Sequence, residues 1–343
     1  MGLAIAWSTV PGQVAIADIY WEITLAWGLT PPSQYVGPHI WAVTPSPDGE
    51  RIAVGSMHQR VLMFDAETGQ PLPSPGHERE WVMEVLWSPD GRWFASTSFS
   101  GQVTIREDAT GRVVYQSAGQ DVAYTVAFHP TRPVAAWGSY DGFVRLVDLT
   151  TEREAGRIAA QDEGVLYTTF TPDGEGLVAS GEDGTIRRFD LGSQKLVVEY
   201  VGHESGVTAV SFSRDARSMI SGGDDATVRV WDTKTGALKS TRSPHSGWIN
   251  FSTFLPGKDV FVTVGTDDGV FVWDLTELDG EPRRLAAHDD WLMCVRPFGD
   301  GQRFVSAGKD GTARIWNADT LEVERVIDVW ESVDPGGFRL PAL

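Results

Sequence analysis

The feature that most constrains the fold of this chain is a short motif that returns about every 42 residues. In its fullest form the motif reads SGGDDATVRVWD, at residues 221–232. Seven segments share this layout, and the residue before the last in each is, in chain order, Phe64, Arg106, Val147, Phe189, Trp231, Trp273 and Trp316. So steady a period is the sequence signature of a repeat architecture.

Each repeat reads as four short strands, and the fifth repeat shows this most clearly. The segments VTAVSFS (207–213), SMISGG (218–223), TVRVWD (227–232) and ALKSTRS (237–243) are separated by turns rich in Gly, Asp and Thr. Strand-like alternation between such turns predicts β-structure, and no window shows the 3.6-residue spacing of an amphipathic helix. Pro and Gly in the recurring SPDG, at 46–49 and 88–91, fit a tight reversal between the first two strands.

These repeats resemble those of the WD40-repeat family. The resemblance rests on Gly-His pairs that open a repeat (Gly76-His77, Gly202-His203) and Trp-Asp pairs that close its third strand (Trp231-Asp232, Trp273-Asp274). It covers residues 38–330 almost continuously. It implies an all-β fold, a WD40-type β-propeller with four-stranded blades around a central channel.

The two ends of the chain bear on the number of blades. Residues 4–18 align without gaps on the third repeat when Trp7 is set on Trp137, so we expect the chain to begin inside a blade, at its second strand. The segment FRLPAL (338–343) could supply that blade's missing first strand. We therefore expect eight blades, with seven as the alternative. The whole chain, 1–343, is expected to form one domain: a partial repeat at 1–36, seven repeats at 37–330 and a closing segment at 331–343.

Ser, His and Asp, the residue types of a nucleophilic triad, recur in these repeats. In the WD40 family, however, a Ser, an Asp, a Trp and a His at set places form a structural hydrogen-bond network. The resemblance implies two complete tetrads, His203, Ser221, Asp225 and Trp231, and His288, Ser306, Asp310 and Trp316; in the sixth repeat Thr263 takes the serine place. A catalytic centre is normally unique in a chain, whereas this set recurs with the repeat. We therefore interpret the tetrads as structural and expect no catalytic residue.

Other chemistry is sparse in the sequence. There is no glycine-rich phosphate loop, paired-histidine metal motif or nucleophile elbow, so neither a cofactor nor a metal is expected. Cys294 is the only cysteine, which excludes an internal disulfide and favours a reducing cytoplasm. A net charge of −19 disfavours nucleic acid and anionic membrane surfaces as partners and favours basic ones.

The resemblance also implies where a partner would dock: on the face that carries the loops entering each blade and the hairpins between second and third strands. Three positions per blade project there, two that flank an inward apolar residue at the start of the first strand and one just before the hairpin aspartate. Read by repeat phase, these face positions predict partner-binding residues Trp41, Met57, Trp81, Met83, Phe99, Tyr124, Tyr140, Trp248, Trp291 and Met293. The fourth and fifth repeats carry small, polar or acidic residues instead, including Glu182 and Asp224.

Aromatic side chains with acidic loops around them, at 77–80, 161–163 and 288–290, suit a protein or peptide partner with apolar anchors and Arg or Lys. We therefore expect a non-enzymatic interaction scaffold that acts as a monomeric propeller within a complex. The alternatives are a structural subunit of a larger assembly and, from another class, an enzyme with a site at the channel mouth. An enzyme would need acids, His or cofactor ligands converging there from several blades, and those positions are mostly apolar.

Overall fold

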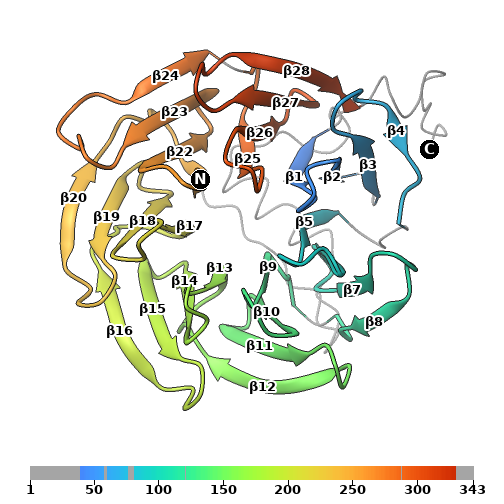
Figure 1. Cartoon of the computed structure of the whole chain (residues 1–343). Coiled ribbons are helices and arrows are strands. Elements are labelled where there is room, and N and C mark those ends of the chain that lie inside the picture. Colours follow the sequence, from blue (N-terminus) through green and yellow to red (C-terminus); the bar gives the residue numbers. More distant parts are fainter. Residues whose placement is uncertain (1–38, 58–59, 76–80, 120, 287, 330–343) are drawn as a thin grey trace, which may run out of the picture. The chain divides into compact units, whose positions relative to one another are not determined.

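The computed structural model describes residues 39–57, 60–75, 81–119, 121–286 and 288–329. Every element that it defines in these ranges is a β-strand. The strands form seven four-stranded sheets, and in each sheet strands consecutive in sequence pair antiparallel. The expected all-β propeller is confirmed, and each sheet is one blade of a ring (Figure 1).

The blades follow one another along the chain, each from its inner to its outer strand. Blade 1 consists of β1 (Ile40–Pro45), β2 (Arg51–Ser56), β3 (Val61–Asp65) and β4 (Pro71–Leu72). Blade 2 consists of β5 (Val82–Trp87), β6 (Trp93–Ser98), β7 (Val103–Glu107) and β8 (Val113–Gln116). Blade 3 consists of β9 (Thr125–Phe128), β10 (Val134–Gly138), β11 (Phe143–Asp148) and β12 (Arg153–Ala159). Blade 4 consists of β13 (Val165–Phe170), β14 (Gly176–Gly181), β15 (Thr185–Asp190) and β16 (Leu196–Val201).

The remaining blades have the same layout. Blade 5 consists of β17 (Val207–Phe212), β18 (Ser218–Gly223), β19 (Val228–Asp232) and β20 (Leu238–Arg242). Blade 6 consists of β21 (Ile249–Phe254), β22 (Val260–Gly265), β23 (Gly269–Asp274) and β24 (Arg283–Ala286). Blade 7 consists of β25 (Leu292–Pro297), β26 (Arg303–Gly308), β27 (Thr312–Asn317) and β28 (Val323–Asp328).

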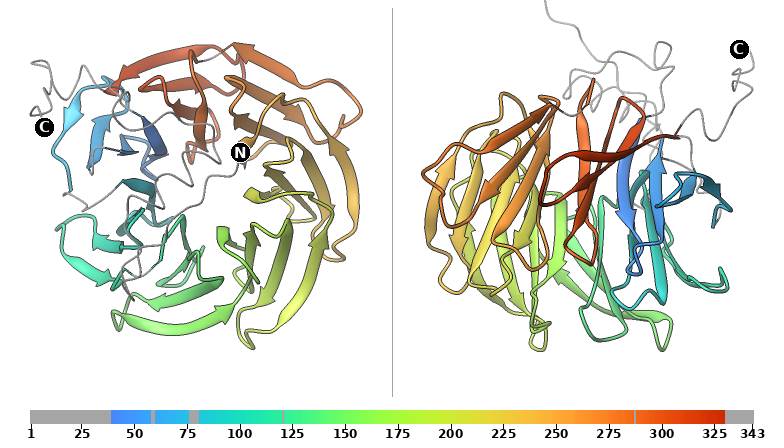
Figure 2. Two further views of the ribbon diagram at one scale, coloured as in Figure 1. Left: turned by 180° about the vertical axis from the view of Figure 1, so that it is seen from behind. Right: turned by 45° about the horizontal axis from the view of Figure 1, so that its top comes forward.

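The ring has seven blades, so the expectation of eight was wrong. Strand β1 packs directly against both β5 and β25, which leaves no place for a further blade between blades 7 and 1 (Figure 2). Contacts at this junction run from the inner strands, where Cys294 Sγ lies 3.5 Å from the Val43 carbonyl, to the rim, where Arg325 Nη1 donates to the Thr68 carbonyl. The expected partial repeat (1–36) and closing segment (331–343) lie outside the described residues, and that division of the chain stays a prediction.

The turns between first and second strands are built by the SPDG pattern. In blade 2 the Asp90 carboxylate accepts from Ser88 Oγ at 2.6 Å and from the Arg92 N–H, while the Trp93 N–H donates to Ser88 Oγ. Gly91 has a φ of +70°, a left-handed conformation that glycine adopts without steric cost. Each such turn delivers the second strand next to the first at one end of the blade.

The hydrophobic core lies between neighbouring blades, because each sheet buries apolar residues on both faces. Stacked aromatic pairs within blades add to this core: the ring centroids of Phe261 and Trp273 lie 5.5 Å apart, and those of Phe304 and Trp316 lie 5.8 Å apart. The tryptophans of the repeat motif are therefore packing residues on the third strand, with Trp231 only 1% exposed.

Candidate functional site

The structure brings each expected tetrad together. In blade 5, His203 Nδ1 lies 2.9 Å from an Asp225 carboxylate oxygen, His203 Nε2 lies 2.7 Å from Ser221 Oγ, and Trp231 Nε1 donates to the same Oγ at 2.8 Å. The set His288, Ser306, Asp310 and Trp316 repeats this geometry in blade 7, and in blade 6 Thr263 takes the serine's place between His245 and Trp273.

These Ser-His-Asp sets have the connectivity of a nucleophilic triad but no access to a substrate. Ser221 and Ser306 are both 0% exposed, and each hydroxyl oxygen already accepts a hydrogen bond from a tryptophan. Burial would raise the pKa of Asp225, yet hydrogen bonds from His203, Thr227 and the Glu204 backbone N–H hold that pKa below its ordinary value. Such fully satisfied networks order a turn and need no further ligand.

Blade 4 has a different network at the same place. Gln161 occupies the position of the tetrad histidine; its Nε2 donates to the Ala179 carbonyl, and its Oε1 accepts from Thr185 Oγ1. Arg187 also donates to Gln161 Oε1. The sequence shows the loss of the tetrad here but not this replacement.

The first and third face positions of each blade lie side by side. The backbone N–H of the third position donates to the carbonyl of the first in all seven blades, at 2.8 to 3.3 Å. Among these pairs are Phe99 with Trp81, Tyr140 with Val122, Asp224 with Gly206 and Lys309 with Trp291. The repeat phase therefore identifies residues that are neighbours in space.

The second face position is a β-bulge, which the sequence did not reveal. In six blades the pairing of first and second strands shifts around this residue, as between Ile40 and Ala42 around Trp41. A bulge redirects its side chain, and here the side chain reaches the next blade: Asn250 Nδ2 donates to the Leu292 carbonyl at 2.7 Å, and Thr208 donates to the Ile249 carbonyl.

The bulge explains an aromatic cluster that spans blades 1 and 2. Trp41 of blade 1 stacks on Trp81 of blade 2 with ring centroids 6.3 Å apart, and Trp81 contacts Phe99 at 5.6 Å. Trp41 and Trp81 are partly buried, whereas Phe99 is only 8% exposed. Phe99 therefore packs against the Trp81 indole and offers a partner little surface itself.

A second part of the face combines two tyrosines of blade 3 with carboxylates of blades 4 and 5. The Tyr124 and Tyr140 rings lie 6.3 Å apart, and Tyr140 is 46% exposed. Glycines occupy the first face position of blades 4 and 5. A Cβ at Gly164 would approach the Tyr140 ring to 2.6 Å, and one at Gly206 would approach Asp224 Oδ2 to 3.1 Å. Because these two residues lack a Cβ, the Tyr140 ring and the Asp224 carboxylate can pack directly against the backbone of blades 4 and 5.

The surroundings of Asp224 disfavour the charged form of its carboxyl group. Burial and the nearby carboxylates of Glu182 and Asp225 raise its pKa to about 6. Its Oδ1 is buried, and in the described residues it has no hydrogen-bond partner. Burial also raises the pKa of Glu182, an effect that the neighbouring Glu163 increases and the Tyr140 hydroxyl opposes. The site thus holds two desolvated carboxylates, and no cation contributes to the shift of either pKa.

The other expected face residues lie in blades 1, 2, 6 and 7. Met57, Met83, Trp248 and Trp291 are partly buried, and Met293 is only 7% exposed. Lys309 Nζ lies 3.5 Å from the Trp291 ring centroid, and burial lowers the pKa of this ammonium to about 8. Of the expected acidic loops, 77–80 lies outside the described residues; Asp162, Glu163 and Asp289 are exposed.

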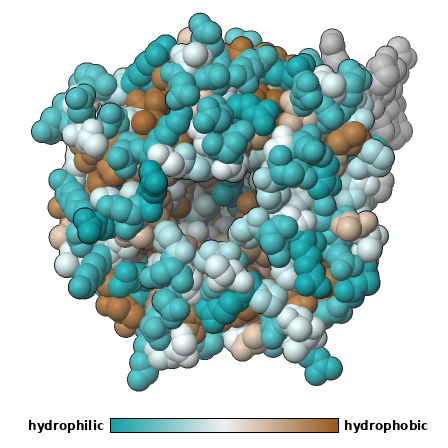
Figure 3. Space-filling model, in the orientation of Figure 1, coloured by the Kyte–Doolittle hydropathy of each residue, from teal (hydrophilic) through white to brown (hydrophobic). Residues whose placement is uncertain are grey.

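The inner strands contribute a polar cluster that sequence reasoning missed. Glu84 of blade 2 pairs with Arg296 of blade 7, and the Arg296 guanidinium lies over the Phe251 ring of blade 6 at 4.4 Å. Tyr167 of blade 4 contacts Phe251 at 5.7 Å. Side chains of non-adjacent blades can meet only inside the ring, so this cluster occupies the central channel. Figure 3 shows one face of the ring, largely hydrophilic around a central hollow.

Over the described ranges, no group of three or more His, Cys, Asp or Glu side chains is arranged to hold a metal ion. No helix in that part of the chain has the length and apolar character to cross a membrane.

Comparisons with known proteins agree with this geometry. The family model "WD domain, G-beta repeat" matches residues 31–65, 69–106, 156–190, 194–232 and 281–317, more than half of the chain. WD repeat-containing protein SL1-17 of Schistosoma mansoni is 28% identical over 143 residues, 40% of this chain and 47% of that protein. Echinoderm microtubule-associated protein-like 2 of Rattus norvegicus is 27% identical over 130 residues, 37% of this chain and 19% of that protein. The matches thus span less than half of either relative.

Proposed function

The chain belongs to the WD40-repeat family, and on that premise we propose that it is a non-enzymatic protein-interaction scaffold that binds a basic segment of a partner protein. The binding surface is the face formed by the three face positions of each blade. Proteins of this family typically act in this way, and the further details of face and partner are our proposal.

Two parts of the face support two kinds of contact. The stacked Trp41 and Trp81 offer flat apolar surface, and Phe99 packs against Trp81; such aromatic groups are frequent anchors of protein interfaces. The carboxylates of Glu182 and Asp224 lie in a different sector, beside Tyr140. An apolar anchor would pack on the tryptophans, and a Lys or Arg would pair with the carboxylates.

The observation that carries the proposal is the state of Asp224. A buried carboxylate oxygen without a hydrogen-bond donor is costly, and the raised pKa of Asp224 reports that cost. A partner ammonium or guanidinium would supply both the charge and the donor. The net charge of −19 adds a long-range attraction for basic partners.

Binding of a basic partner can be tested with paired variants. The tagged chain and its D224N/E182Q variant would be used to capture partners from an extract of the encoding organism, followed by mass spectrometry. We expect the basic partners of the wild-type chain to be lost with D224N/E182Q and with W81A/W248A/W291A. They should be retained with D215N, which removes an exposed carboxylate from a turn at the opposite end of blade 5. An unchanged partner set with folded D224N/E182Q would overturn the proposal.

Two alternative functions were a structural subunit of an assembly and an enzyme. A structural subunit would use the same surface, and stoichiometric co-purification with the partner would distinguish it from a transient binder. The enzyme hypothesis needed polar groups converging from several blades, and such groups are present at Glu84, Tyr167 and Arg296. They are buried and bonded to one another, so nothing in their arrangement favours catalysis. A cytoplasmic location stays part of the proposal.

The microtubule association in the name of the rat relative belongs to that protein. Because the match covers 19% of it, we do not extend that association to this chain.

A further inference from the structure

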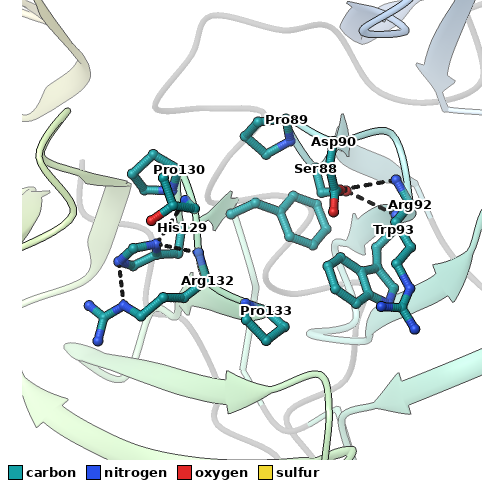
Figure 4. Close-up of a pocket in the computed structure, with 11 residues that line it drawn as sticks. Ser88, Pro89, Asp90, Arg92, Trp93, His129, Pro130, Arg132 and Pro133 are labelled. Carbon is teal, nitrogen blue, oxygen red and sulfur yellow. Dashed lines mark hydrogen bonds between the residues drawn. The ribbon is translucent and has the colours of Figure 1, made fainter.

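A cavity of about 210 Å³ opens between blades 2 and 3, at the end of the blades opposite to the face described above (Figure 4). Its walls are the turns that join first to second strands, at residues 88–93 and 128–133. Strand β5 (Val82–Trp87) joins Trp81 at one end of blade 2 to Ser88 at the other, so the cavity and the aromatic face are separated by the length of the strand.

The walls of the cavity combine apolar surface with two arginines, Arg92 and Arg132, and one carboxylate, Asp90. Trp93 and Phe128 are 6% and 8% exposed, and the rings of Pro89, Pro130 and Pro133 also line the cavity. Sites that enclose drug-sized ligands have roughly 300–1,000 Å³. This smaller cavity has room for one side chain or a group of similar size.

Arg92 is an exposed cation at the edge of the cavity. Its guanidinium lies 4.6 Å from the Trp93 ring centroid, and within the described ranges it takes part in no ion pair. The nearby Asp90 carboxylate accepts from Ser88 Oγ and the Arg92 backbone N–H and forms no ion pair with the guanidinium among the described residues. In a chain with 47 acidic and 28 basic residues, an arginine without a carboxylate partner is notable.

Arg132, on the blade 3 side, also lacks a full set of acceptors. His129 Nδ1 accepts the backbone N–H groups of Thr131 and Arg132, at 3.1 and 2.9 Å, so the ring proton of the neutral imidazole is on Nε2 and points to the Gly174 carbonyl. Arg132 Nε, 2.8 Å from His129 Nε2, therefore meets an N–H rather than an acceptor. Its Nη2 does reach the Gly174 carbonyl, at 2.9 Å. A carboxylate would give this exposed guanidinium the acceptor that His129 cannot provide.

We propose that this cavity binds an acidic peptide segment, with one apolar side chain between the turns of blades 2 and 3 and flanking Asp or Glu carboxylates on Arg92 and Arg132. The two guanidinium groups match carboxylates, which they can bind through two parallel hydrogen bonds. The rings of Trp93, Phe128 and the prolines require an apolar group between the charges. Two arginines are too few for nucleic acid, whose binding needs clustered cations. This site is independent of the proposed basic-partner face and has the opposite charge preference.

A peptide array tests the ligand class directly. The probes are Ac-Asp-Glu-Xaa-Glu-Asp peptides with each of the twenty amino acids at Xaa, and the uncharged Ac-Asn-Gln-Xaa-Gln-Asn series, incubated with the labelled full-length chain. We expect binding in the acidic series when Xaa is aromatic, Pro or Leu, little when Xaa is Gly, and none in the uncharged series. Absence of binding across the acidic series, or equal binding in both series, would overturn the proposal.

Variants locate the binding in solution. With the best acidic peptide in fluorescence anisotropy, R92Q/R132Q should weaken binding about tenfold, because both charge-assisted contacts are lost. The matched control is R217Q: Arg217 occupies the place of Arg92 in the blade 5 turn, but Ser218 replaces Trp93 there. R217Q and D224N should leave the affinity unchanged. Equal affinity for R92Q/R132Q and the wild type would show that the peptide binds elsewhere and would refute the assignment. Both arginines are exposed, so these variants keep the fold.

Discussion

Glu84 of blade 2 and Arg296 of blade 7 form an ion pair inside the ring, although blade 1 separates their blades. Glu84 is 5% exposed, and the Arg296 side chain is 15% exposed. The pair therefore joins, through the channel, two blades that do not pack on each other through their sheets. Its energetic contribution can be measured because each partner has an uncharged replacement of similar size.

Removing one partner of this pair should destabilise the ring more than removing both. Glu84→Gln or Arg296→Met alone leaves a buried charge without its counter-ion, at a cost of about 3–5 kcal/mol of unfolding free energy. The double variant buries no charge and should recover most of that loss. Urea unfolding of the four proteins gives the coupling energy. Additive losses in the double variant would show that the pair does not act as a unit.

The tetrads should contribute stability and no chemistry. Ser221→Ala leaves the Trp231 N–H without its buried acceptor and should cost about 1–3 kcal/mol of unfolding free energy, whereas Thr263→Ser in blade 6 should be nearly neutral because Ser keeps the hydroxyl. Urea denaturation checks both values. A Ser221→Ala variant as stable as the wild type would contradict the structural role.

Acid should weaken the tetrads over a defined pH range. The pKa of Asp310 falls from 3.8 to about 2 in the folded chain, because hydrogen bonds from His288 and Thr312 outweigh the opposing effect of burial. A carboxyl group with a lowered folded pKa adds stability that is complete above its unfolded pKa and is lost as the pH falls toward the folded value. The free-energy difference between the wild type and Asp310→Asn should therefore shrink between pH 4 and pH 2, by about 2 kcal/mol at most. Urea titrations at several pH values measure it.

The sequence predicted the strands of each blade because the signals for them are local. Period-two alternation and turn residues act within a few positions, and in blade 5 the expected strands agree with β17 to β20 to within two residues. The blade number depends instead on whether β1 docks on β25. The contact between Cys294 and Val43 there joins residues 251 apart in sequence, and no local pattern reports it. We expected an eighth blade because seven repeats left the two ends of the chain without a role. The packing of β1 on β25 excludes a blade between them.

The candidate site was predictable only where it follows the repeat. First and third face positions keep their phase, so the resemblance and the repeat phase together predicted that Trp81 and Phe99 lie on one face. Glu84 is the residue after the bulge of β5, whereas Arg296 is the third residue after the bulge of β25. The two residues therefore occupy different positions in the repeat, and repeat phase could not predict that they pair. The pKa of Asp224 is raised because its carboxyl group is buried next to Glu182 of another blade. This contact between blades cannot be deduced from composition.

Asp224 should cost the free protein stability at neutral pH. Its folded pKa of about 6 lies above the ordinary 3.8, because burial and the Glu182 carboxylate disfavour the charged form. For a carboxyl group with a raised folded pKa, the folded state binds more protons, and stability falls as the pH rises from about 4 through 6. Asp224→Asn should therefore be more stable than the wild type above pH 7, by about 1–3 kcal/mol, and equal to it near pH 4. Thermal unfolding across this range checks the crossover, and Asp259→Asn, at an exposed turn position, is the control.

Cys294 offers a measurement of ring closure, since its thiol lies at the junction of blades 7 and 1. The residue is 2% exposed, its Sγ lies 3.5 Å from the Val43 carbonyl, and burial raises the pKa of the thiol to about 11. Because the thiolate is the reactive form, alkylation by iodoacetamide at pH 8 should wait for an opening that separates β25 from β1. We expect the native chain to react at least about a thousandfold more slowly than the chain in urea, and Glu84→Gln to react faster than the wild type. Equal rates for native and unfolded chains would mean that blades 7 and 1 part readily, and would contradict a ring closed by that junction.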